Sequence, residues 1–316
     1  MSDGEEDAVL TEAEEEEGEG REEEEQIQVR PLTPETIIQG LSLLCRTGNG
    51  LSHAFVKLDL REKGLTDIDA IGNYIHLRFL DVSNNHLTDL SPLASLNQLL
   101  WLKIDKNAVA SFKGQPLDQL TYLQWLSLTM NKLQDLEGLA GPALENLILT
   151  GNSIQRVSNL ENGQLTNLVT LELRGNSLET TDGIYLPNLR RLYLAQNGIK
   201  RLEGLEKLER LNTLHLRDNQ LETLDGIGPN MKSLQYLNVR GNVIFSQRAL
   251  RSLRHVSGTL RTLVLSENPL EDSGDYRLYV LTCLPQLERL DKEPVSSEER
   301  TEAKDRMKEL KEEEDT

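Results

Sequence analysis

Asparagine returns at nearly constant spacing along most of this chain, and that spacing limits the possible folds more than any other feature. Each of these asparagines closes a copy of the pattern Leu-x-x-Leu-x-Leu-x-x-Asn-x-Leu, and ten copies begin 21–26 residues apart between Phe55 and Leu260. The first copy has Lys63 in place of the asparagine. A sequence that repeats at this period predicts a chain coiled into stacked turns of nearly equal shape. The asparagines are Asn85, Asn107, Asn131, Asn152, Asn176, Asn197, Asn219, Asn242 and Asn268.

The residues inside each copy predict what one turn looks like. The fourth and sixth positions are apolar and alternate with polar ones, as Leu80 and Val82 do, which indicates a short strand with one buried face. Each asparagine can turn inward and satisfy the backbone groups of neighbouring turns. This is the pattern of leucine-rich repeats. We therefore expect an α/β, right-handed solenoid of about ten repeats, with a parallel β-sheet on its concave face and short 3₁₀ or helical segments on its convex side.

The parts outside the repeats predict caps and tails around one elongated domain. We expect residues 1–31 to be an acidic disordered tail, 32–54 a helical N-terminal cap, 55–270 the leucine-rich repeats, 271–295 a C-terminal cap and 296–316 a charged helical extension. The N-terminal tail either keeps the protein soluble or meets a basic partner. The C-terminal extension is either solvated or docks on a partner.

Local signals place the helices of these parts. Thr33 and Pro34 predict the start of a helix that continues through an apolar stripe to Cys45 and ends near Gly48. A second helix is expected from Asp275 to Cys283. On the convex side, the segment Leu90–Leu99 fits a short helix, with Ser91 as its cap before Pro92.

Charge and composition exclude several classes of function. The net charge is −18, and residues 1–26 alone carry fourteen acids and one arginine, which argues against direct nucleic-acid binding. The start of the chain lacks a secretory signal, and no apolar run is long enough to cross a membrane. The two cysteines, Cys45 and Cys283, fall in opposite caps, too far apart for a disulfide, so we expect reduced thiols and a cytoplasmic protein.

No motif in the chain predicts chemistry. The five histidines are scattered without metal-ligand spacing, and there is no glycine-rich phosphate loop. We therefore expect no catalytic residues, no metal, no cofactor and no small-molecule substrate, and the protein is predicted not to be an enzyme.

Strand alternation points one set of residues outward from the sheet, and aromatic residues gather there. The third pattern position holds Phe79, Trp101 and Trp125 in three successive repeats, and adjacent strands would place these rings in a row. Such rings could shield the edge of the leucine core. The interpretation that we favour is a hot spot for a partner protein, because tryptophan contributes strongly to interface energies.

The later repeats predict a basic and aromatic half of the same surface. Its arginines are Arg174, Arg191, Arg217 and Arg240, and its rings are Tyr193, His215 and Tyr236. An ordinary solvated face is one interpretation, and recognition of an acidic partner segment by guanidinium groups is the other. Because Asp59, Asp81 and Asp105 lie on the first three strands, the surface is expected to run from acidic to basic.

The C-terminal segments carry a resemblance to known proteins. Asn268–Leu270, Tyr276–Arg277 and Leu284–Asp291 resemble the C-terminal cap of the phosphatase-regulator-like class of leucine-rich repeats. More of the chain is similar to a family of axonemal leucine-rich-repeat proteins associated with radial spokes. That similarity lies in Leu43–Leu51, Tyr74–Arg78, Leu171–Asn176, Tyr193–Asn197, Leu214–Asn219 and Met231–Leu237.

The resemblance implies a structural role without catalysis. It implies a component of motile cilia and sperm flagella, located in the cytoplasm and cytoskeleton at the axoneme. Its partners would be proteins of the radial-spoke head and neighbouring axonemal proteins. The alternative is a regulatory subunit that binds a protein phosphatase catalytic subunit. A spliceosomal adaptor is less favoured, because basic import signals are absent from the sequence.

Overall fold

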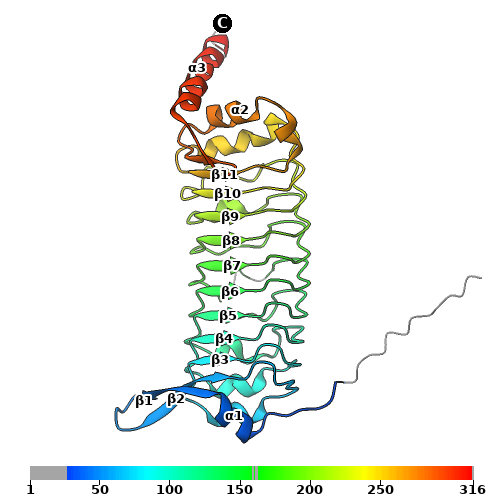
Figure 1. Ribbon diagram of the computed structural model, residues 1–316, viewed down its shortest axis with the longest axis vertical. Helices are drawn as coiled ribbons and strands as arrows, with labels where there is room; N and C mark the ends of the chain where they lie inside the picture. Colours follow the sequence, from blue (N-terminus) through cyan, green and yellow to red (C-terminus); the bar gives the residue numbers. More distant parts are fainter. Residues whose placement is uncertain (1–26, 159, 161–162, 315–316) are drawn as a thin grey trace, which may run out of the picture.

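The chain climbs as a column of stacked turns, with one short strand on the same side of each turn (Figure 1). The computed structural model describes residues 27–158, 160 and 163–314, so the acidic residues 1–26 lie outside the described part. Within the described residues, thirteen strands form one sheet in sequence order. Strands β2 to β12 pair in parallel, and the two end pairs, β1–β2 and β12–β13, are antiparallel. The fold is the α/β leucine-rich-repeat solenoid that the asparagine spacing predicts.

The strands are short and the connecting helices are mostly single turns. The strands are β1 Leu41–Arg46, β2 His53–Asp59, β3 Phe79–Asp81, β4 Trp101–Lys103, β5 Trp125–Ser127, β6 Asn146–Ile148, β7 Thr170–Glu172, β8 Arg191–Tyr193, β9 Thr213–His215, β10 Tyr236–Asn238, β11 Thr262–Val264, β12 Arg289–Leu290 and β13 Glu293–Pro294. The α-helices are α1 Pro34–Gly40, α2 Tyr276–Cys283 and α3 Ser297–Glu314. The 3₁₀ segments are η1 Asp69–Asn73, η2 Ser91–Ser95, η3 Pro116–Gln119, η5 Leu205–Lys207, η6 Gln247–Val256 and η7 Pro269–Asp272.

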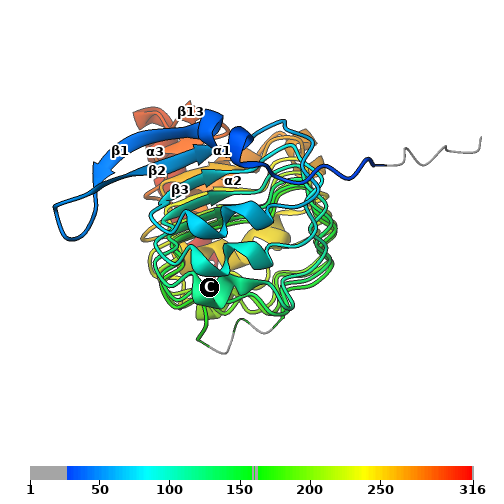
Figure 2. The ribbon, with the colours of Figure 1, turned by 90° about the horizontal axis from the view of Figure 1, so that it is seen from below.

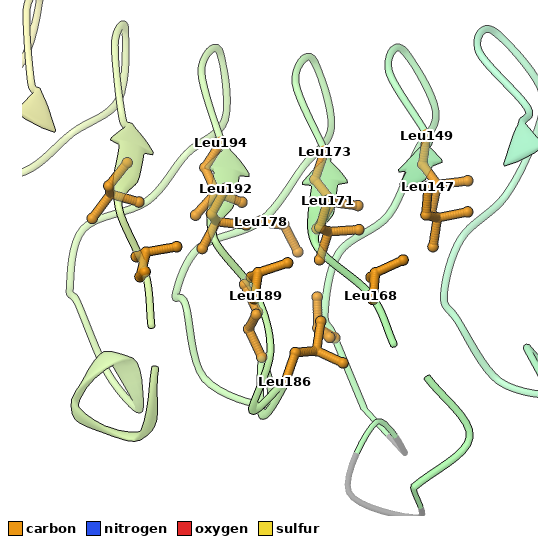
Figure 3. Packing of buried hydrophobic residues seen from close by; sticks show 14 of the residues in the cluster. Leu147, Leu149, Leu168, Leu171, Leu173, Leu178, Leu186, Leu189, Leu192 and Leu194 are labelled. Carbon is orange, nitrogen blue, oxygen red and sulfur yellow. The ribbon is translucent and has the colours of Figure 1, made fainter. Parts of the chain in front are cut away.

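Leucines of equal pattern position stack from turn to turn and form the core. Leu147 of β6 pairs in register with Leu171 of β7, which pairs with Leu192 of β8, and all three are fully buried. Figure 3 shows the same side chains pointing into the space between the sheet and the outer wall, where Leu168 and Leu189 meet them from the preceding segment. Each buried leucine contributes about 1.5–3 kcal/mol relative to an exposed one, so the repeats stabilise one another through contact with their neighbours.

The nine pattern asparagines form a hydrogen-bonded ladder that joins consecutive turns. Asn219 is representative: its Nδ2 donates to the carbonyl oxygens of Leu216 at 3.0 Å and Leu194 at 2.9 Å, and its Oδ1 accepts from the N–H of Ile199 at 3.0 Å. All nine asparagines accept an N–H from the preceding turn and donate to a carbonyl oxygen of that turn. At the end of the series, Oδ1 of Asp291 accepts the N–H groups of Leu265 and Ser266.

A left-handed backbone conformation directs each asparagine inward. The residue immediately before every ladder asparagine has a positive φ, for example 52° at Lys106 and 64° at Gly175. Glycine adopts this conformation readily, whereas other residues are strained there. The other residues at this position are Asn84, Met130, Gly151, Gln196, Asp218, Gly241 and Glu267.

The N-terminal cap differs from the predicted helix. Helix α1 ends at Gly40, and Leu41–Arg46 forms strand β1 of a hairpin with β2, so the prediction of a helix through Cys45 was wrong. A larger residue in place of Gly40 would force the end of α1 to shift, because its Cβ would lie 2.2 Å from the carbonyl oxygen of Asp59. Phe55, taken as the first pattern position, is 45% exposed on β2. Figure 2 shows the hairpin reaching out beyond the side of the column.

The C-terminal cap is closer to the prediction. Helix α2 starts one residue after Asp275 and ends at Cys283, and β12 adds one further parallel strand to the sheet. Helix α3 then packs against this cap through Ala303, which is 5% exposed. The guanidinium of Arg277 forms an ion pair with Glu299, which ties α2 to α3.

The convex side contains short 3₁₀ segments, as expected, but with a different cap in the second one. Ser91 is the first residue inside η2, and Leu90 occupies the cap position without a side-chain hydrogen bond. The Oδ1 atom of Asp89 accepts the N–H of Ser91 at 2.9 Å, so the side-chain acceptor at the start of this segment comes from Asp89 and not from Ser91.

Two further sequence expectations concern cysteines and membranes. Cys45 on β1 and Cys283 on α2 are both free thiols at opposite ends of the column. Across residues 27–158, 160 and 163–314, no helix has the length and apolar character needed to cross a membrane.

Candidate functional site

The outer face of the sheet brings two of the predicted aromatic residues into direct contact. Trp101 of β4 and Trp125 of β5 occupy the same register position, and their rings stack with centroids 4.7 Å apart and planes 9° apart. This distance equals the spacing of neighbouring strands, about 4.8 Å, so equal side chains at equal register must stack. We call this pair the tryptophan stack. Phe79 lies beside it in register on β3.

The tryptophan stack is only partly shielded by the protein itself. Phe79, Trp101 and Trp125 are all half-buried, while the middle residues of the same strands, Leu80, Leu102 and Leu126, are buried. The rings therefore cover the outside of the sheet and still present apolar surface to solvent. Ladder asparagines hydrogen-bond to the backbone just after each of the strands β3 to β5, so this surface is preorganised before any partner arrives.

A second stack lies four strands along the same face. The imidazole of His215 lies between the rings of Tyr193 and Tyr236, with centroid distances of 4.8 Å on each side. Tyr193 is its register neighbour, and Tyr236 reaches it diagonally from the strand on the other side. Burial between the two rings lowers the pKa of His215 from its usual 6.5, so the imidazole is neutral at physiological pH. The stack is therefore aromatic and uncharged.

The arginines of the surface are partly neutralised within the chain. Arg217 pairs with Asp218 at 3.0 Å, and Arg240 forms an ion pair with Glu267 that lowers the pKa of that carboxyl. The two others bond to neutral acceptors: Arg174 Nε donates to Gln196 at 3.0 Å, and Arg191 Nε donates to Thr170 Oγ1 at 3.0 Å. Among the described residues, two of the four predicted cations thus have an acid beside them, and Arg174 and Arg191 bond to neutral groups.

The acidic end of the surface is compensated in the same way. Asp59 accepts hydrogen bonds from Arg61, which hold the pKa of that carboxyl below its usual value. Asp81 lies 3.7 Å from the same guanidinium, and Oδ1 of Asp105 accepts from Ser127 Oγ and the Thr129 N–H. The gradient from acidic to basic that the sequence suggests is therefore weakened by local pairing.

Two features of the surface escaped the sequence analysis. The hairpin β1–β2 exposes Leu44 and, in its loop, Leu51, at 59% and 87%. An open groove with a volume of about 1150 Å³ follows the edge of the sheet where the chain enters strands β5 to β10, and Arg190 and Arg210 line it. Both arginines precede strands, so an analysis based on alternation within strands could not find them. Among the described residues, no group of three or more histidine, cysteine or acidic side chains could hold a metal ion.

Comparison with known sequences places the chain among leucine-rich-repeat proteins. A family model described as a leucine-rich repeat matches residues 170–315, and a second such model matches residues 76–97. Leucine-rich repeat-containing protein 23 from Homo sapiens is 52% identical over 90% of this chain and 82% of its own length. The protein of the same name from Mus musculus is 49% identical over 90% of this chain and 82% of its own length.

Solved structures agree with the fold. The structure of a TLR13–ssRNA13 complex superposes with a TM-score of 0.62 and 23% identity, covering 75% of this chain and 36% of that one. An internalin from Listeria monocytogenes covers 74% of this chain with a TM-score of 0.49 and 21% identity. At 23% identity, the superposition on the TLR13–ssRNA13 complex supports the solenoid architecture alone.

Proposed function

Because this chain belongs to the leucine-rich repeat-containing protein 23 family, we propose that it is a non-enzymatic scaffold of the axonemal radial spoke in motile cilia and sperm flagella. Its location would be the spoke-head region, and its partners would be spoke-head and neighbouring axonemal proteins. The family and the fold both belong to leucine-rich-repeat proteins, whose extended surfaces are suited to binding other proteins.

The tryptophan stack is the observation that carries the proposal of protein binding. Two half-exposed indoles on a rigid sheet offer a flat apolar surface at no ordering cost, and buried tryptophans are among the residues that contribute most to interfaces. Phe79 extends the apolar surface by one strand. A partner that covers the rings would bury the apolar surface of Trp101 and Trp125 that is exposed to solvent in the isolated chain.

The ladder supports a mechanical role for such a scaffold. Every turn from Asn85 to Asn268 is hydrogen-bonded to its predecessor by an asparagine side chain, as well as by the sheet. A load applied to a partner on the sheet face would therefore pass through many parallel bonds. This suits a part that transmits force between neighbours in a moving assembly.

The proposal can be tested by expressing the tagged chain in ciliated cells and identifying co-purifying proteins by mass spectrometry. We expect radial-spoke proteins with the wild type and a strong depletion of them with Trp101→Ala combined with Trp125→Ala. Phe245→Ala is a matched control, because Phe245 is an aromatic residue that is 65% exposed away from the stack. Thermal unfolding of each variant checks that the fold is kept.

Two results would contradict the proposal in different ways. Stoichiometric recovery of a phosphatase catalytic subunit without spoke proteins would favour the regulatory-subunit alternative. Recovery of the same spoke proteins by both the wild type and the double tryptophan variant would support the scaffold role but show that the partner contacts a surface other than the tryptophan stack.

A further inference from the structure

Among the residues that the structure describes, the groove at the start of the strands carries more positive than negative side chains. We call it the strand-start groove; it is lined by side chains from the turns that lead into β5 to β10. Its lining contains Arg190, Arg191 and Arg210 and only one acid, Glu145. The surplus of two positive charges at this place contrasts with Arg217 and Arg240 on the sheet face, each of which forms an ion pair with an acid.

Two of the three guanidinium groups, those of Arg191 and Arg210, hydrogen-bond to neutral side chains of the described residues. Arg210 Nη1 donates to Asn188 Oδ1 at 2.7 Å, and Asn188 Nδ2 donates to the carbonyl oxygen of Thr166 at 2.6 Å. Arg191 uses its Nε for Thr170, as described above. Within the described part of the chain, the side chain of Arg190 makes no hydrogen bond or ion pair. Each arginine therefore keeps most of its donors for a ligand.

Backbone groups beside the groove are already satisfied, so a ligand would meet side chains rather than a sheet edge. The N–H groups of Arg190 and Arg191 both donate to the carbonyl oxygen of Val169, and the carbonyl oxygen of Arg190 accepts from Asn212. The groove thus offers guanidinium and amide donors on an ordered framework. Carboxylates are the groups that guanidinium donors bind with two parallel hydrogen bonds.

We propose that the strand-start groove binds an acidic, extended segment of a partner protein. The turns that line the groove are about 4.8 Å apart, so the five spacings from β5 to β10 give a length of about 24 Å. An extended peptide of about seven residues covers this distance, with alternate side chains facing the arginines. This site is separate from the tryptophan stack, and the proposal does not rest on the proposed axonemal function.

The probe for this proposal is a fluorescein-labelled peptide of five Glu-Ser repeats, measured by fluorescence anisotropy with the full chain. We expect the variant Arg190→Gln, Arg191→Gln and Arg210→Gln to bind at least about tenfold more weakly than the wild type. Raising the salt from about 50 mM to about 300 mM should also weaken binding by the wild type. A peptide of five Gln-Ser repeats should not bind.

A matched variant controls for net charge. Arg156→Gln, Arg248→Gln and Arg251→Gln removes the same number of positive charges from exposed positions outside the groove, and should change affinity by less than about twofold. Circular dichroism should be the same for all variants. The variant with Trp101→Ala and Trp125→Ala should bind the peptide like the wild type. The groove proposal and the proposed function at the tryptophan stack can therefore fail independently of each other.

Three outcomes would overturn the assignment. Equal weakening by both triple variants would show attraction by net charge alone. Tighter binding of a single-stranded RNA oligonucleotide than of the acidic peptide would make nucleic acid the ligand. Binding of the peptide only after removal of residues 1–26 would identify the chain's own acidic leader as the occupant, in place of a partner.

Discussion

Replacement of one central ladder asparagine tests how the repeats are joined. Asn219→Ala removes four hydrogen bonds. The longest, 3.3 Å to the carbonyl oxygen of Arg217, matters least, because that oxygen keeps a bond of 2.8 Å from the N–H of Gln196. The groups that make the other three are not affected equally. The carbonyl oxygen of Leu194 still accepts from Asn197, and that of Leu216 still accepts from Asn242. Only the N–H of Ile199 loses its sole partner.

Because the two carbonyl oxygens keep a second donor, the expected loss in the free energy of unfolding is moderate. An orphaned buried donor costs about 1–3 kcal/mol, and the two weakened carbonyls add about 0.5–1 kcal/mol each, so we expect a loss of about 3 kcal/mol. If the carbonyl oxygens of Leu194 and Leu216 depended on Asn219 alone, three orphaned groups would cost about 6 kcal/mol or more. The difference between the two values is large enough to measure.

Urea unfolding followed by circular dichroism gives the global value, provided that the slope is unchanged between variants. Asn230→Ala is the control, because Asn230 is exposed and outside the ladder, and its effect should stay within about 0.5 kcal/mol. Hydrogen exchange at the Ile199 amide gives a local readout, and it should accelerate in Asn219→Ala. A loss below about 1 kcal/mol, or unchanged exchange at Ile199, would refute the reasoning.

Three other predictions follow from conformation and charge. Lys106→Gly should raise stability by up to about 1 kcal/mol, because the strain of a left-handed residue, about 1–2 kcal/mol, exceeds the entropic cost of glycine, about 0.5–1 kcal/mol. Gly175→Ala should lower stability for the same reason, and thermal unfolding measures both effects. Because burial lowers the pKa of His215, protonation opposes folding, so stability should fall as the pH drops below 6.5; NMR titration gives the pKa, and His215→Phe should remove this dependence. The Arg277 guanidinium lowers the pKa of Glu299 to about 2, so the tie between α2 and α3 should be complete above pH 4.5 and lost as the pH falls toward 2. Hydrogen exchange in α3 should then increase over that range, and Glu299→Gln should remove the pH dependence.

The sequence predicts the repeats well because one local rule is used in every turn. An asparagine at fixed spacing, with leucines on both sides, has one way to satisfy its amide, and the structure contains the corresponding bonds at Asn219 and its equivalents. The N-terminal cap has no such rule. The apolar residues from Ile37 to Cys45 fit the period of a helix, but Leu41–Arg46 pairs with β2, which only the tertiary contact decides.

The surface was harder to predict because side-chain pairing crosses turns. Strand alternation was enough to bring Trp101 and Trp125 together, since equal positions on parallel strands are neighbours. It could not show that Arg240 meets Glu267, twenty-seven residues later and outside the strand pattern. It also gave no reason to select Arg190 and Arg210, whose common position becomes apparent only when the turns are stacked.

The antiparallel strands at both ends of the sheet disfavour end-to-end association of identical molecules. A purely parallel stack has two complementary edges, and identical molecules could join head to tail into an endless filament. Here β1 and β13 reverse the strand direction, so the hydrogen-bond spacing at each outer edge no longer matches that of the parallel turns. Polymerisation by that route is disfavoured. The ten spacings from β2 to β12 span about 48 Å, so the number of turns fixes the length of the column.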